Sequence, residues 1–161
     1  MPHAGKRSKL ERPGLPEHCN SNQLRRAARY VTRYYDLALA SSGLRSTQYT
    51  LLGYLITSGP MTMARLAKAM AMDRATLGHN LRPLERDGLL VIAISEDDRR
   101  ARLVSITEHG HATVMRAHPA WRRAQKGFEK ALGRDEASHL RDLMDRIVAA
   151  SFPRIEPDRS Y

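Results

Sequence analysis

The residues with the clearest chemical pattern stand between two short apolar runs, where carboxylates and arginines are neighbours. The segment S95-E-D-D-R-R-A101 follows the apolar run Leu90–Ile94 and precedes Arg102–Ile106, in which polar and apolar residues alternate. This pattern predicts a β-hairpin with a charged tip. A carboxylate can hold a neighbouring arginine by charge-assisted hydrogen bonds so that its guanidinium enters a narrow DNA minor groove, where negative potential is concentrated.

A helix is predicted directly before this hairpin, between Asp73 and Gly88. The Asp73 carboxylate can accept hydrogen bonds from the first backbone N–H groups, and Gly88 suits the residue that ends a helix. One face is an apolar stripe with helical spacing, made of Leu77, Leu81 and Leu84. The other face carries Arg74, Thr76, His79, Asn80 and Arg82. We expect Pro83 to kink this helix without ending it.

A shorter helix precedes it, capped by Thr62, and a turn at Ala71-Met72 joins the two. The order helix, turn, helix and hairpin over residues 61–107 is that of a winged helix-turn-helix, which places its second helix in the DNA major groove. The second helix taken alone is equally compatible with an ordinary amphipathic helix whose polar face is solvated. The hairpin and the helix-turn-helix spacing favour DNA recognition.

The remaining segments predict a helical scaffold, so the fold class is mainly α with a small β-hairpin. Helices are expected from a cap at Ser21 or Asn22 to about residue 42, over 47–57, over 108–132 with a bend at Pro119, and over 134–151. The first and last two carry more apolar surface than one small chain can bury, which predicts a homodimer. The expected organisation is a disordered basic tail (1–18), a first dimerisation helix (19–43), a winged helix-turn-helix domain (44–107) and two further dimerisation helices (108–161).

Composition restricts the class of protein. The chain has 161 residues, a net charge of +10 and one cysteine. A single cysteine excludes an internal disulfide framework, and no apolar run reaches the length of a membrane span, so we expect a soluble cytoplasmic protein. Between residues 73 and 105 six arginines are balanced by six acids. Much of the attraction to phosphates must therefore come from elsewhere, including the tail with Lys6, Arg7, Lys9 and Arg12.

Other chemistries are poorly supported by the residues. The chain has no glycine-rich phosphate loop, nucleophile motif or isolated acid pair, so we expect no enzyme and no cofactor. His111 and His118 lie two helical turns apart near His109, yet no cysteine or acid cluster completes a metal site, which favours a surface or interface role for them.

The hairpin and its surroundings resemble the MarR (multiple antibiotic resistance regulator) family of dimeric transcription factors. The segment D98-R-R-A-R-L-V-S-I-T107 fits that family's Asp-x-Arg-x-x-x-Val-x-Leu-Thr wing with Ile for Leu, supported by L66-A67, L84-E-R-D-G-L89 and Gly110. The likeness extends over about residues 24–148. It implies a minor-groove role for Arg100, with Asp98 as its orienting partner, and a DNA-binding position for Arg99. It also implies a DNA-facing position for Arg74, Ala75, Thr76, His79, Asn80 and Arg82.

The resemblance further implies a homodimer on a pseudo-palindromic operator, expected to be a repressor released by a small aromatic or phenolic ligand. The residues suggested for that pocket are Tyr34, Leu37, Tyr49, Tyr54 and Met63. One alternative is a redox sensor using Cys19 with nearby tyrosines. Others are an architectural DNA binder without a ligand response and a protein-interaction module that does not bind DNA.

Overall fold

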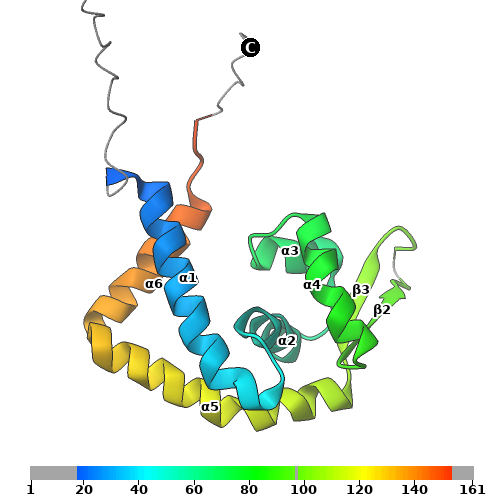
Figure 1. Cartoon of the computed structure of the whole chain (residues 1–161). Coiled ribbons are helices and arrows are strands. Elements are labelled where there is room, and N and C mark those ends of the chain that lie inside the picture. Colours follow the sequence, from blue (N-terminus) through cyan, green and yellow to red (C-terminus); the bar gives the residue numbers. More distant parts are fainter. Residues whose placement is uncertain (1–17, 97, 154–161) are drawn as a thin grey trace, which may run out of the picture.

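The computed structural model describes residues 18–96 and 98–153, and within them a helical protein with one small sheet. Figure 1 shows a long helical arm, formed by α1, α5 and α6, beside a lobe that contains α3, α4 and the strands. The elements in chain order are α1 (Asn20–Leu39), η2 (Ala40–Ser42), α2 (Ser46–Ser58), β1 (Met61–Thr62), α3 (Met63–Ala69), α4 (Arg74–Arg86), β2 (Leu90–Ile94), β3 (Arg102–Ile106), α5 (Glu108–Leu132) and α6 (Arg134–Ala149). The predicted basic tail lies largely outside the described residues.

The predicted caps of the helix-turn-helix are confirmed. The Thr62 hydroxyl accepts from the backbone N–H of Arg65, and Asp73 accepts from that of Thr76. At the other end of α4, Gly88 adopts a left-handed φ of 69°. The N–H of Gly88 donates to Glu85 and that of Leu89 to Leu84, which satisfies the last carbonyls of the helix. The helix continues through Pro83 to Arg86, as expected.

The sheet has three strands in the order β1-β3-β2, one more than the predicted hairpin. The hairpin register pairs Leu90 with Ile106 and Ile94 with Arg102. The added strand β1 pairs Met61 with Val104. A strand of two residues has too few positions to show alternation, so the sequence pattern could not reveal it.

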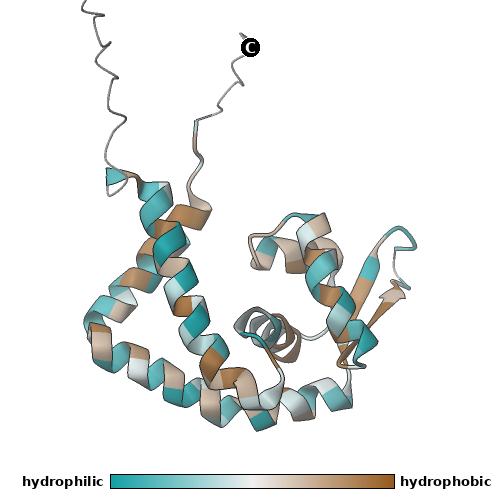
Figure 2. Ribbon diagram, viewed as in Figure 1, coloured by the Kyte–Doolittle hydropathy of each residue, from teal (hydrophilic) through white to brown (hydrophobic). Residues whose placement is uncertain are grey.

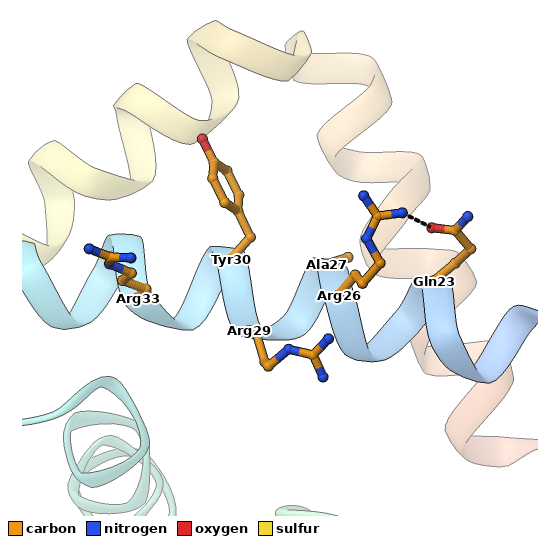
Figure 3. A pocket seen from close by; sticks show the side chains of 6 residues that line it. All are labelled: Gln23, Arg26, Ala27, Arg29, Tyr30 and Arg33. Atoms are coloured by element: carbon orange, nitrogen blue, oxygen red, sulfur yellow. Dashed lines mark hydrogen bonds between the residues drawn. The ribbon is translucent and has the colours of Figure 1, made fainter. Parts of the chain in front are cut away.

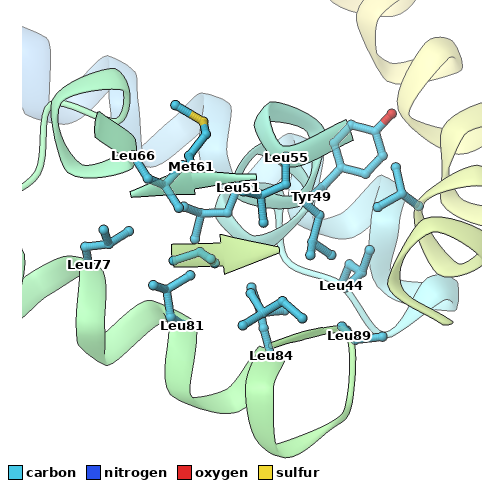
Figure 4. Close-up of a cluster of buried hydrophobic side chains, with 14 of the residues drawn as sticks. Leu44, Tyr49, Leu51, Leu55, Met61, Leu66, Leu77, Leu81, Leu84 and Leu89 are labelled. Atoms are coloured by element: carbon cyan, nitrogen blue, oxygen red, sulfur yellow. The ribbon is translucent and has the colours of Figure 1, made fainter. Parts of the chain in front are cut away.

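The core forms where α4 packs on α2 and the sheet. The leucines predicted to form the buried stripe of α4 are all fully buried and belong to the same core cluster as Val104. Figure 4 shows them on the side of α4 where Leu51 and Leu55 lie. Burial of this stripe fixes the rotation of α4, so its polar face must point away from the protein.

The first helix begins earlier than predicted. Cys19, and neither Ser21 nor Asn22, is the N-cap residue, and its side chain makes no capping hydrogen bond. At the far end η2 extends the helical path to Ser42, where Gly43 turns the chain with a φ of 74°. The helix α1 packs against α5, and the Tyr34 hydroxyl donates to the Ala124 carbonyl at 3.2 Å.

Apolar surface remains exposed on the helical arm. Figure 2 shows apolar positions recurring along α1 and α6. On α6 only Ala137 is buried, while Leu143 and Val148 are 49% and 66% exposed. Among the described residues, no helix combines the length and hydropathy that crossing a membrane requires.

Candidate nucleic-acid interface

The exposed face of α4 carries the residues predicted to read DNA. Asn80 is half-buried, and the others are exposed: Arg74, Ala75, Thr76, His79 and Arg82. Because the buried leucine stripe holds the opposite side of the helix, these side chains form one solvent-facing strip. An α-helix with such a strip fits the width of the major groove.

Thr76 is already engaged at the start of this strip. Its backbone N–H donates to Asp73 Oδ1 at 2.7 Å, and its hydroxyl donates to Asp73 Oδ2 at 2.8 Å. The first of these bonds, with the second in support, lowers the pKa of Asp73 below its usual value of 3.8. With its proton committed to the carboxylate, the Thr76 hydroxyl can only accept a further hydrogen bond.

Asn80 is oriented by the same turn of the helix. Its amide Nδ2 donates to the Thr76 carbonyl at 2.8 Å. This leaves the amide oxygen and one N–H, the pair that asparagine uses to recognise adenine in the major groove.

The wing differs from the prediction in how Asp98 holds Arg100. Asp98 Oδ1 accepts from the backbone N–H of Arg100 at 2.9 Å, and not from its guanidinium. The Asp98 carbonyl accepts from Ala101, while Ser95 N–H donates back to the Ala101 carbonyl. Asp98 therefore shapes the turn that carries Arg100, whereas the predicted contact was with the side chain. Asp97 at the tip lies outside the described residues.

The arginines of this surface are available for an anion. The ion pairs among the described residues join Arg45 to Asp36, Arg86 to Asp87 and Arg141 to Glu129. Within those same ranges, Arg74, Arg82, Arg99 and Arg100 are exposed and have no carboxylate partner. Although the local sum of charges is near zero, the arginines remain free to bind phosphate.

The five residues suggested for a ligand pocket are not brought together. Tyr34 and Leu37 line a groove between α1 and α5. Tyr49 is buried against Trp121, with ring centroids 5.7 Å apart, and its hydroxyl lies 2.8 Å from His118 Nδ1. Tyr54 and Met63 pack against the core.

A different cavity lies where α1, α2 and α5 meet. It has a volume of about 260 Å³ and is lined by Val31, Thr32, Tyr35, Ser46, Thr50, Trp121 and Gln125. The Tyr35 hydroxyl donates to Gln125 Oε1 at 2.7 Å. Burial, followed by the nearby Tyr34 and Glu129, raises the pKa of Tyr35 above 10.0, so this wall stays uncharged at neutral pH. Sequence reasoning missed this cavity because its residues come from three separate helices.

The residues considered for redox or metal chemistry are Cys19 and the histidines of α5. Cys19 is exposed at the start of α1. His118 stacks on Trp121 of the same helix, and its Nδ1 lies 2.8 Å from the Tyr49 hydroxyl of α2, so it contributes to the contact between α2 and α5. Within residues 18–96 and 98–153, no three His, Cys, Asp or Glu side chains form a group that could hold a metal ion.

The comparisons with known proteins agree with this geometry. A model of the MarR family matches residues 42–101. The transcriptional repressor NicR of Pseudomonas putida is 31% identical over 125 residues, covering 78% of this chain and 79% of NicR. The Mycobacterium tuberculosis regulator MosR, solved in complex with DNA, superposes with a TM-score of 0.74 at 31% identity, covering 81% of this chain and 94% of MosR. The repressor CouR, bound to a 23-mer DNA duplex, gives a TM-score of 0.73 at 26% identity, covering 83% and 95%. The chain therefore belongs to the MarR family of DNA-binding transcriptional regulators.

Proposed function

We propose that the chain is a homodimeric repressor that binds a pseudo-palindromic operator and is released by a small aromatic or phenolic ligand. The observation that carries the DNA-binding part is the exposed strip of polar and cationic side chains on α4, beside a wing whose Arg100 has no ion-pair partner among the described residues. The repressor direction is supported by the name of NicR, which is a repressor.

In this proposal α4 enters the major groove and the wing reaches the adjacent minor groove. Asn80 reads a base edge with its free amide atoms, and Thr76 accepts from a base amino group because its own proton is used. Arg100 senses minor-groove width and potential. Arg82 and Arg99 supply phosphate contacts, which carry affinity but no sequence preference.

The dimer is supported by apolar surface that one chain leaves uncovered. Tyr30 and Leu37 of α1 are 80% and 68% exposed, and Leu143 and Val148 of α6 are exposed as well. Figure 3 shows Tyr30 projecting from α1, and the same pocket is lined by Gln23, Arg26, Ala27, Arg29 and Arg33. A second copy placed on α1 and α6 would bury these residues and set two recognition helices at a fixed spacing.

The effector site in this proposal is the cavity between α1, α2 and α5. Its lining offers Trp121 for stacking and hydroxyl and amide groups for hydrogen bonds, without a charged side chain. Such a lining suits an uncharged monocyclic phenol better than a carboxylate. The cavity lies where α2 meets α1 and α5 of the helical arm. A ligand that changes the position of the arm relative to the DNA-binding elements would change the spacing of the two α4 helices in the dimer.

Selection of duplexes from a random-sequence pool by the full chain tests the DNA-binding proposal. We expect an enriched inverted repeat with half-site centres about one helical turn apart, protected in a footprint on both halves. A footprint without sequence preference would identify an architectural DNA binder. Absence of DNA binding would identify a protein-interaction module. A promoter carrying the selected repeat, fused to a reporter, should be silenced by the wild-type chain, and activation would contradict the repressor role.

A further inference from the structure

A cleft separates the wing from the start of the two helices of the helix-turn-helix. It has a volume of about 610 Å³ and is bounded by segments that are far apart in the sequence. The lining residues are Thr62, Met63 and Ala64 at the start of α3, Arg74 at the start of α4, and Asp98, Arg100, Ala101 and Arg102 of the wing.

The strand register brings Arg102 to this cleft. Side chains alternate along a strand, and Val104 of β3 is completely buried against the helices. Arg102 is two residues earlier and therefore on the same, helix-facing side of the sheet. Its cross-strand partner Ile94 is 61% exposed, so the apolar core has ended at this level. Arg102 thus faces the helices beyond the core, where it meets solvent.

The cleft is positively charged. Three arginines line it against one carboxylate, and that carboxylate of Asp98 is already hydrogen-bonded to the backbone N–H of Arg100. Among the described residues neither Arg74 nor Arg102 has an ion-pair partner. A cleft lined by several arginines favours an oxyanion, which guanidinium groups bind through paired hydrogen bonds.

The position of the cleft points to the source of that oxyanion. A protein with one element in the major groove and another in the adjacent minor groove must straddle the sugar-phosphate strand between those grooves. The cleft lies between the start of α4 and the wing, which are these two elements. We infer that the cleft is a binding site for one backbone phosphate of bound DNA, in which Arg102 and Arg74 supply the positive charge. This inference rests on the proposed placement of α4 and the wing, and it gives Arg102 a role separate from that of Arg100.

The test compares R102Q with wild type and with R122Q, which removes one exposed charge on α5, away from the cleft. Each full chain is titrated with the duplex selected by the wild type and with a scrambled duplex of equal composition. R102Q should weaken both complexes by the same factor, on the order of tenfold at low salt. The slope of log K against log salt should fall by about 0.9 for each protomer bound. R122Q should behave as wild type.

Neutral methylphosphonate linkages, introduced singly along the selected duplex, locate the phosphate. One linkage in each half-site should weaken wild-type binding and leave R102Q binding unchanged. If wild type binds and R102Q binds both duplexes with the same affinity as R122Q, the inference is wrong and the proposed function stands. The same holds if R102Q loses affinity only for the selected sequence. If wild type binds no duplex, the proposed function itself has failed.

Inorganic phosphate in place of chloride at equal ionic strength separates a free oxyanion from a DNA phosphate. We expect low-millimolar phosphate to have the same effect on DNA binding by wild type and R102Q. Inhibition of wild type alone, together with equal methylphosphonate profiles for the two proteins, would assign the cleft to a free oxyanion and overturn the DNA assignment.

Discussion

The Asp98 carboxylate accepts a hydrogen bond from the backbone N–H of Arg100, with 2.9 Å between Oδ1 and N. The aspartate therefore sets the direction of Arg100 through the path of the chain. A neutral side-chain oxygen can accept the same bond, whereas an ion pair with the guanidinium would require the charge.

This contact predicts different outcomes for Asp98→Asn and Asp98→Ala. Asp98→Asn should retain wild-type affinity for the selected duplex or tighten it slightly, because the turn is kept and a negative charge near DNA is removed. Asp98→Ala should weaken binding by a factor smaller than Arg100→Ala, since the arginine is released but not deleted. Equal losses in Asp98→Asn and Asp98→Ala, measured by fluorescence anisotropy, would show that the carboxylate acts through its charge.

Capping of α4 by Asp73 should make the stability of the protein depend on pH. Hydrogen bonds from Thr76 lower the pKa of Asp73 in the folded state. The stabilisation is therefore fully present above the usual pKa of 3.8 and is lost as the pH falls through the folded value. The melting temperature of Asp73→Ala should lie below that of wild type at pH 6, and the gap should close below about pH 4. Glu85→Ala, which removes another exposed carboxylate of α4, is the control and should show no such convergence.

The start of α5 needs a glycine at position 110. A Cβ atom there would collide with the backbone carbonyl of Leu89, which also accepts from Thr107 N–H. Gly110→Ala should lower the free energy of unfolding by about 1–3 kcal/mol, because backbone must move to admit the methyl group. Gly53→Ala in α2, where nothing lies within 4 Å, should instead raise it by about 0.4–1 kcal/mol. Chemical denaturation measures the free energy of unfolding of both variants. An unchanged value for Gly110→Ala would contradict the close approach of position 110 to the Leu89 carbonyl.

The exposed face of α6 predicts a dimer that two substitutions can dissociate. Wild type should sediment at twice the chain mass of 18.2 kDa. Leu143→Asp with Val148→Asp should sediment as a folded monomer, since both side chains are exposed within one chain. Met115→Asp, which places an acid at a 52% exposed residue of α5, is the control and should remain dimeric. A double variant that stays dimeric would place the interface elsewhere.

Ligand binding to the cavity can be followed through Trp121, the only tryptophan in the sequence. In a panel of monocyclic phenols and matching benzoates, we expect the phenols to quench its fluorescence more strongly, because no charged group lines the cavity. Tyr35→Phe should weaken this binding, and Tyr54→Phe outside the cavity should not. Stronger binding of benzoates would contradict the uncharged site. Loss of DNA binding after peroxide treatment of wild type, but not of Cys19→Ser, would favour the redox alternative.

The sequence by itself determined the helix-turn-helix and the hairpin, because their signals are local. The caps at Thr62 and Asp73, the glycine at 88 and the leucine stripe of α4 are each set within a few residues, and each is found as predicted. The exposed face of α4 followed from that stripe, since a helix with one side buried has only one side to present.

Only the tertiary structure decided the features that require segments far apart in the sequence to meet. Strand β1 exists because Met61 lies beside Val104, forty-three residues later in the chain. The cavity beside Trp121 needs three helices, and the cleft at Arg102 needs the wing to face α3 and α4. The path of the turn also decided that Asp98 binds the backbone N–H of Arg100 and not its guanidinium. Residue types and spacing indicate which groups can interact, whereas the packing of the chain selects which of them do.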